Sequence, residues 1–176
     1  MIFSETHIPG AFLISLHRAE DERGFFARAF CRSEFSEHGL NPDLEQCSIS
    51  FNKQKGTLRG MHFQRSPYEE TKIVRCTMGA LFDVIIDLRP DSPTFKQWLS
   101  FDLNAENRSM LYIPRGLAHG FLTMQDNTEV FYQMADRYVP ESASGVRWND
   151  PAFGIRWPES PRIISAKDRE YRDFSL

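Results

Sequence analysis

The chain has 176 residues, enough for one domain with a single sizeable core, and we expect residues 1–176 to form that one domain. Its net charge of −3 excludes the broad basic surface that binds phosphates, so no nucleic-acid partner is expected. No apolar run reaches the ~18 residues of a membrane span, and no signal-peptide pattern is present. The three cysteines form no CxxC unit and are typical of reduced thiols, so we expect a cytoplasmic protein without a membrane partner.

The first forty residues predict short strands and one helix. Residues 1–17 alternate apolar and polar side chains as an early strand does. A turn signal at 21–24, with Arg23 at its tip, precedes a second predicted strand over 25–30. Residues 32–41 predict a short helix that ends at a glycine.

Strands dominate the chain from there to Tyr138. They are predicted at 45–52, 73–77, 80–88, 95–103, 109–113, 121–124 and 129–134. A spacing of about 8–12 residues, with turn residues between, is typical of an antiparallel sandwich or barrel. In the strand at 45–52 one face carries Gln46, Ser48 and Ser50. Such a polar row favours the wall of a polar cavity over a packed core.

The stretch from 56 to 72 holds the first candidate for chemistry, His62. In a regular strand His62 shares a face with Gly60, whose missing side chain leaves room beside the imidazole. Two cations, Arg59 and Lys72, bracket the histidine. A titratable imidazole with space and positive charge nearby predicts a pocket for an anionic ligand and a proton-transfer reaction. A histidine that merely completes the packing of a strand is the alternative.

A metal site is a second possibility. Small β-barrels can bind a metal through a His-x-His pair, a glutamate and a later histidine, but the residue two after His62 is Gln64. Glu69 or Glu70 could still join His62 and His119 in a facial triad for Fe(II). A lysine two residues after the second glutamate disfavours a bound cation, so no metal ligand is assigned.

The competing constellation combines His62 with Tyr132 and Asp168. Removing a proton from the carbon beside a ketone needs a base on one face, and inverting that centre needs a proton donor on the other. The enolate oxygen needs a positive or hydrogen-bonding partner, which Lys72 could supply. An imidazole suits the base, a tyrosine hydroxyl suits the acid, and a carboxylate would fix the tautomer of the imidazole. Spacing alone does not bring these side chains together, and each also fits a purely structural role.

Motifs extend in one order over nearly the whole chain. They are DERGFF at 21–26, GTLRGMHFQ at 56–64, KIVR at 72–75, DVIIDLRPDSPTF at 83–95, IPRGLAHGF at 113–121, WNDP at 148–151, IRWP at 155–158 and SAKD at 165–168. By these motifs the chain resembles the dTDP-4-dehydrorhamnose 3,5-epimerase family, metal-free nucleotide-sugar epimerases among the cupin barrels. The resemblance implies an all-β, cupin-type β-barrel or jelly roll with a few short helices.

The implied activity is epimerisation at C3, C5 or both of a nucleotide-linked 4-keto-6-deoxyhexose, through an enolate and without a cofactor. A C3-only epimerase or a 3,4-ketoisomerase on another nucleotide sugar, such as a CDP-linked one, begins with the same proton abstraction. A sugar-binding barrel without catalysis and a metal-dependent cupin oxygenase are the alternatives from other classes.

The resemblance also implies roles for single residues. His62 is the base, Asp168 orients it and Tyr132 is the acid. The substrate-binding positions are Arg23, Phe26, Gln46, Ser48, Arg59, Lys72, His119, Tyr138 (which stacks near the nucleobase) and Lys167. The implied assembly is a homodimer with an exchanged N-terminal strand, in which Arg23 reaches the partner's site.

Three positions depart from the family pattern. Arg28 and Ala143 stand where the rhamnose-pathway enzymes carry glutamates, and Gln46-Cys47-Ser48 replaces Gln-Asp-Asn. All three are ligand-contact positions outside the proton-transfer machinery. The chemistry is therefore expected to be retained, while the nucleotide and the sugar stay open.

Overall fold

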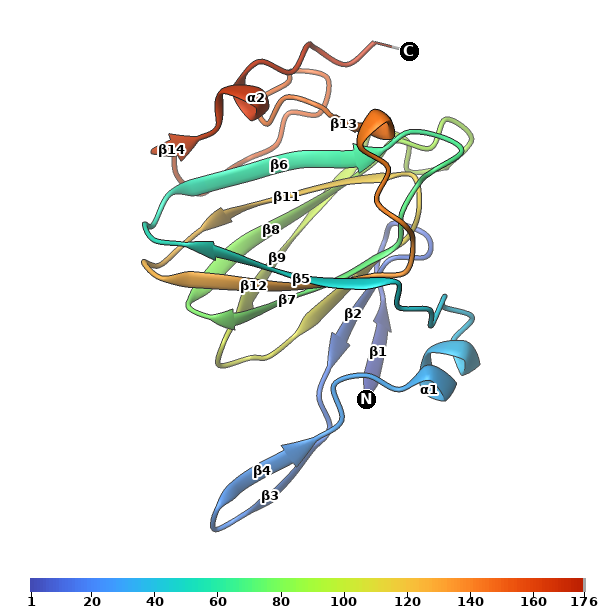
Figure 1. Ribbon diagram of the computed structural model, residues 1–176, viewed down its shortest axis with the longest axis vertical. Helices are drawn as coiled ribbons and strands as arrows, with labels where there is room; N and C mark the ends of the chain where they lie inside the picture. The colour runs from blue at the N-terminus through green and yellow to red at the C-terminus, as the bar shows by residue number, and fades with distance from the viewer. Residues whose placement is uncertain (176) are drawn as a thin grey trace.

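The computed structural model describes residues 1–175 and consists mainly of antiparallel strands in two facing sheets (Figure 1). The first sheet has the order β1 (Ile2–Glu5), β2 (Phe12–Ser15), β10 (Met110–Ile113), β7 (Lys72–Met78), β12 (Thr128–Met134) and β5 (Gln46–Asn52). The second has the order β13 (Ala143–Gly145), β6 (Thr57–Gln64), β11 (Leu117–Thr123), β8 (Ala80–Asp87) and β9 (Trp98–Asn104), with β14 (Ile163–Ile164) parallel to β6. The all-β prediction is confirmed.

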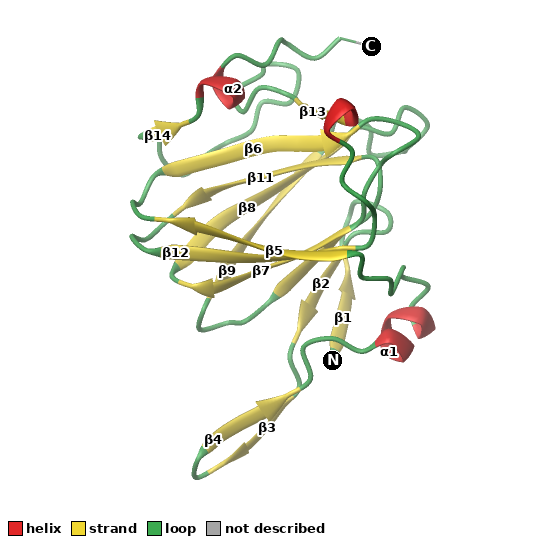
Figure 2. Cartoon of the chain, viewed as in Figure 1, coloured by secondary structure: helices red, strands yellow, loops and turns green. Residues whose placement is uncertain are grey.

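The main core lies between the two sheets. Val74 and Val130 from the first sheet meet Ile85 and Phe121 from the second, and all four side chains are buried. Because alternate residues of a strand point to opposite faces, each strand gives every second side chain to this layer. The loops and short helices lie around the two sheets (Figure 2).

Segments outside the sheets cover parts of their outer faces. The helix α1 (Arg32–Glu37) packs Phe35 against Ile14 and Ile73 of the first sheet. On the second sheet, the chain that follows Tyr138 places Val146 and other apolar side chains over the outer face. No helix within residues 1–175 is long and apolar enough to cross a membrane.

One hairpin projects away from both sheets. Its strands are β3 (Arg18–Asp21) and β4 (Gly24–Ala27), drawn in blue in Figure 1. The predicted strand at 25–30 is therefore shorter, since pairing with β3 ends at Ala27. Phe26, near the tip, is 80% exposed.

Two strand starts differ from the sequence prediction by more than one residue. The strand predicted to begin at 95 begins at Trp98. The buried carboxylate of Asp87 accepts hydrogen bonds from Arg89, Ser92 and Thr94 and so holds the loop that precedes Trp98 in a non-strand conformation. The strand predicted at 121–124 begins four residues earlier, at Leu117. Gly120 lies within this strand, where its missing side chain allows a close contact with β6.

Candidate active site

A β-bulge in β6 turns Arg59 and His62 toward the same cavity. His119 of β11 pairs with His62, but Phe121 pairs with Arg59. Between these two pairs β6 advances by three residues, whereas β11 advances by two. Bulges re-aim side chains in this way beside functional sites. A regular alternation along this strand would place Arg59 on the other face from His62, so that expectation is wrong at this point.

The missing side chain of Gly60 has a different role from the predicted one. A Cβ built on Gly60 would lie 2.5 Å from the Cα of Gly120, so the missing side chain serves the close approach of β6 to β11. It leaves no room for a ligand beside His62. The Gly60 N–H instead donates to Asp168 Oδ2 at 3.3 Å, which ties the bulge to the residue that orients the histidine.

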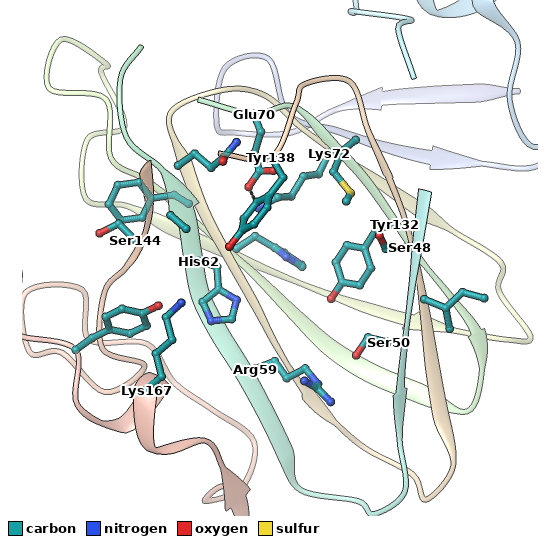
Figure 3. Close-up of a pocket in the computed structure, with 17 residues that line it drawn as sticks. Ser48, Ser50, Arg59, His62, Glu70, Lys72, Tyr132, Tyr138, Ser144 and Lys167 are labelled. Atoms are coloured by element: carbon teal, nitrogen blue, oxygen red, sulfur yellow. Dashed lines mark ion pairs between the residues drawn. The ribbon is translucent and has the colours of Figure 1, made fainter. Parts of the chain in front are cut away.

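The cavity opens between the two sheets and has a volume of about 390 Å³, within the size range of small-molecule sites (Figure 3). The second sheet supplies Arg59, His62 and His119, and the first sheet supplies Ser48, Ser50, Lys72 and Tyr132. Lys167 comes from the C-terminal segment and Tyr138 from the chain after β12. The polar face predicted for the strand at 45–52 thus faces a cavity at its two serines.

His62 and Asp168 form a close pair. The helix α2 (Ala166–Arg169) carries Asp168, and Ser165 caps it by accepting the Asp168 backbone N–H at 3.0 Å. His62 Nε2 lies 2.7 Å from Asp168 Oδ1. Burial raises the pKa of Asp168, but hydrogen bonds from His62 and the Gly60 N–H outweigh it and hold that pKa below its ordinary value. The ionised carboxylate accepts from Nε2–H, so Nδ1 keeps a free lone pair.

The imidazole remains available to a ligand. The His62 side chain is 43% exposed and lines the cavity, while its partner carboxylate is almost fully buried. A fixed tautomer with an open ring nitrogen is the arrangement that a general base requires.

Tyr132 faces His62 across the cavity from the opposite sheet (Figure 3). Burial raises the pKa of the Tyr132 hydroxyl, and the nearby carboxylate of Asp83 raises it further, with Arg59 opposing in part. The hydroxyl therefore stays protonated at neutral pH. A proton donor and an imidazole on facing walls can act on the two faces of one bound carbon.

A second histidine–aspartate pair lies beside the first. His119 Nε2 is 2.8 Å from Asp83 Oδ2, and both side chains are buried. The ring of His119 lies edge-on to Tyr132, with the centroids 6.0 Å apart. Burial raises the pKa of Asp83 although His119 opposes the shift. His119 is thus a fixed hydrogen-bonding group on the cavity wall.

Lys72 is held by Glu70, with 2.7 Å between Nζ and Oε1 and both side chains largely buried. The facial triad weighed from the sequence is not assembled, because Glu70, His62 and His119 each pair with a different residue. Within residues 1–175 no three His, Cys, Asp or Glu side chains gather as a metal-binding group.

Three residues predicted to bind substrate lie outside the cavity of their own chain. Arg23 and Phe26 are on the projecting hairpin, where Arg23 pairs with Asp21. Gln46, at the start of β5, is absent from the cavity wall. Ser48, Arg59, Lys72, His119, Tyr138 and Lys167 do line it.

Tyr171 and Gln64 are among the wall residues that the sequence prediction missed. The ring of Tyr171 lies edge-on to His62 at 6.2 Å, and a Cβ on Gly145 would come within 2.3 Å of it. Tyr171 looked like part of a polar tail, and nothing in its local sequence signals the contact. Gln64 was considered only as the residue in place of a second imidazole.

Comparisons with known proteins identify the family of the chain. The sequence model of the family described as dTDP-4-dehydrorhamnose 3,5-epimerase matches residues 5–175. The Salmonella typhimurium protein of that name is 43% identical over 170 residues, which cover 96% of this chain and 92% of the relative. The solved structure of dTDP-4-dehydrorhamnose 3,5-epimerase from Bacillus anthracis, with TDP and PPi bound, has a TM-score of 0.95 at 39% identity and covers 98% of this chain and 99% of its own.

A 3'-monoepimerase from Streptomyces bikiniensis, solved in complex with dTDP-quinovose, has a TM-score of 0.88 at 28% identity. The match covers 96% of this chain and 85% of that one. The expected cupin-type architecture is confirmed by these neighbours. The chain belongs to the dTDP-4-dehydrorhamnose 3,5-epimerase family.

Proposed function

We propose that this single-domain protein epimerises C3 and C5 of a dTDP-linked 4-keto-6-deoxyhexose in deoxysugar biosynthesis, without a cofactor. Family membership makes it an isomerase. The observation that carries the proposal is the His62–Asp168 pair opposite the protonated Tyr132 hydroxyl in one cavity. Free thiols at Cys31, Cys47 and Cys76 support a reducing, cytoplasmic setting.

The reaction begins with proton abstraction next to the ketone. His62 Nδ1 takes the proton of the carbon beside C4, and the electrons of that C–H bond move onto the carbonyl oxygen as an enolate. Asp168 stabilises the imidazolium that forms. The Lys72 ammonium and the His119 ring stand on the cavity wall where they can stabilise the oxygen's developing charge.

Inversion follows when the proton returns on the other face. The Tyr132 hydroxyl gives its proton to the carbon, the enolate collapses to the ketone, and the phenolate recovers a proton from solvent. His62 returns its own proton to solvent, so the net proton count is unchanged. The same sequence at the second carbon beside C4 completes the double epimerisation.

The cations of the cavity suit a diphosphate. Arg59 donates from Nε to Asn52 Oδ1 at 2.8 Å, which fixes its guanidinium on the wall, and Lys167 lies beside His62 (Figure 3). Tyr138 is 49% exposed at the cavity wall and suits stacking on the nucleobase. Ser48 adds a hydroxyl from β5.

A homodimer would complete this site. Ile49 and Phe51 are 63% and 46% exposed on β5, the edge strand of the first sheet, and Ile49 also borders the cavity. The projecting hairpin, which carries Arg23 and Phe26, pairs with no other strand of the described residues, and its own chain contacts it through Arg18 and Phe25 at the turn that holds Arg108. We propose that the hairpin and the N-terminal strand pack on a second copy, placing Arg23 and Phe26 at the partner's cavity, with Gln46 at the junction.

The proposed reaction is tested in D2O with dTDP-4-keto-6-deoxyglucose, followed by NMR. We expect deuterium at C3 and C5 together with inversion at both centres, because each proton passes through an exchangeable group. CDP-, UDP- and GDP-linked 4-keto sugars run in parallel identify the nucleotide. Deuterium at C3 alone would make the enzyme a 3-epimerase, a shift of the keto group would make it a ketoisomerase, and no exchange with any sugar would refute the proposal.

Shared sites predict complementation between two defective variants. Arg23→Ala spoils the site of the partner chain, whereas His62→Asn spoils the site of its own chain. A refolded equal mixture should regain about a quarter of the wild-type kcat/KM, because half of the dimers are mixed and each has one intact site. Light scattering checks that the species is a dimer. A monomer mass, or a mixture no more active than its parts, would contradict the exchange.

A further inference from the structure

Gln64 ends β6 as one of the most buried polar side chains of the cavity wall, at 2% exposed. Its Nε2 donates to the backbone carbonyls of Tyr68 at 2.9 Å and Arg137 at 3.1 Å. Its Oε1 accepts the Val139 N–H at 2.6 Å. One amide at the end of β6 therefore ties the turn at Tyr68 to the segment around Val139, which lies 75 residues after Gln64.

Tyr138 lies between two of these anchors. Gln64 bonds the residue before Tyr138 through its carbonyl and the residue after it through its N–H. The peptide groups on both sides of Tyr138 are thus fixed to β6. The Tyr138 ring itself is half-exposed at the cavity. Its direction is set mainly by its backbone.

The other segment tied by Gln64 has further supports. The Arg65 N–H donates to the Ser142 carbonyl at 2.9 Å, and the Thr71 N–H donates to Asp136 Oδ2 at 2.8 Å. These bonds hold the loop that leads to Glu70 and Lys72 without help from Gln64. The same two bonds also anchor Asp136 and Ser142, but neither adjoins Tyr138, whose two flanking peptide groups are bonded by Gln64. Loss of the amide should therefore disturb Tyr138 more than the ion pair that holds Lys72.

We propose that Gln64 is a positioning residue for ligand binding, whose amide fixes the backbone around Tyr138 so that the ring covers the nucleoside end of the substrate. This inference rests on the proposed function, because it assumes a nucleoside diphosphate in the cavity. A glutamine is required because the site presents two carbonyls and one N–H, and only a carboxamide offers two donors and an acceptor together.

Gln64→Leu tests the inference by removing all three bonds while keeping a similar volume. We expect dTDP to bind about tenfold more weakly, because a mobile Tyr138 loses conformational entropy when the ligand binds. The value of kcat should change little. Gln64→Glu keeps the acceptor for Val139 but loses both donors, so it should also bind dTDP more weakly than the wild type does. Gln97→Leu is the matched control, because its amide bonds His7 outside the cavity.

A double-mutant cycle decides whether Gln64 acts through Tyr138. If it does, Gln64→Leu should add little to the loss in dTDP affinity already caused by Tyr138→Ala. Additive losses, an unchanged dTDP affinity in Gln64→Leu, or a fall in kcat equal to the rise in KM would overturn the inference. If Gln64→Leu fails to fold in a thermal scan, the same cycle is run with Gln64→Glu.

Wild-type protein is measured first, with dTDP by calorimetry and with the 4-keto sugar in D2O. A wild type that binds no dTDP and exchanges no deuterium overturns the proposed function and this inference together. A wild type that binds dTDP no better than Gln64→Leu does, while still exchanging deuterium, overturns this inference alone.

Discussion

The His62→Asn variant should lose epimerisation and deuterium exchange together, by at least roughly 10²–10⁴-fold in kcat. Both readouts depend on the first proton abstraction, and an asparagine amide has no basic lone pair to accept that proton. Asp168 is bonded by Nε2 of His62, and the shorter asparagine amide reaches only the Nδ1 position, so a thermal scan accompanies the assay to show that the fold survives the loss of this partner. NMR in D2O measures both quantities in one tube.

His119→Asn is the matched control for this variant. It also replaces an imidazole that is bonded to an aspartate on the same cavity wall, through the 2.8 Å contact with Asp83. We expect it to slow the reaction through poorer stabilisation of the enolate while exchange remains measurable. If His119→Asn stopped exchange and His62→Asn did not, the base would be His119 and the roles of the two histidines would be reversed.

The local pattern of β6 could be predicted only up to the bulge. His62 does point away from Met61, which packs on the outer face as a regular alternation requires, whereas Phe63 packs on that face and also borders the cavity. Arg59 breaks the alternation because β6 must pass Gly120, a residue of another strand about sixty positions away. A contact between residues so far apart in sequence does not change the local alternation of side chains, so the sequence pattern cannot reveal it.

The pairing of His62 with Asp168 came from the resemblance and could not be derived from spacing. The two residues are 106 positions apart. They meet because β14 pairs with the start of β6, Ile163 beside Thr57, and the Ser165 cap then begins α2 at the level of the histidine. A strand of two residues has too little pattern to be predicted from its sequence.

The positions of Arg23 and Phe26 show a different limit. The turn at 21–24 and the strand after it were predicted from the sequence, and both are present in the hairpin. Which cavity these side chains serve depends on the arrangement of two chains, and the fold of one chain leaves them exposed. The side-chain pattern of one sequence predicts strands and turns within one chain, but it does not predict how two chains are arranged.

The departures at the ligand-contact positions fall into two groups. Ala143 lines the cavity on β13, so a small side chain there changes the space around a ligand directly. Arg28 instead pairs with Glu34 of α1, away from the cavity wall. The loss of one glutamate therefore acts within the cavity of this chain, whereas the gain of the arginine does not.

Tyr132→Phe should separate the two halves of the reaction. The change keeps the ring and removes only a hydroxyl, so folding should be little disturbed. His62 still forms the enolate, and its imidazole, 43% exposed, can trade its proton for a solvent deuteron and return it to the face it came from. Exchange should therefore persist, while inversion falls by roughly 10²–10⁴-fold because the opposite face has lost its donor.

The measurement is the ratio of deuterium incorporated to centres inverted, followed by NMR at C3 and C5. Tyr138→Phe is the control, since it removes a hydroxyl from the same cavity and should leave that ratio unchanged. Burial holds the Tyr132 hydroxyl protonated, and removing it leaves solvent as the replacement donor on that face. A Tyr132→Phe enzyme that inverts at nearly the wild-type rate would show that the proton on the second face comes from another group.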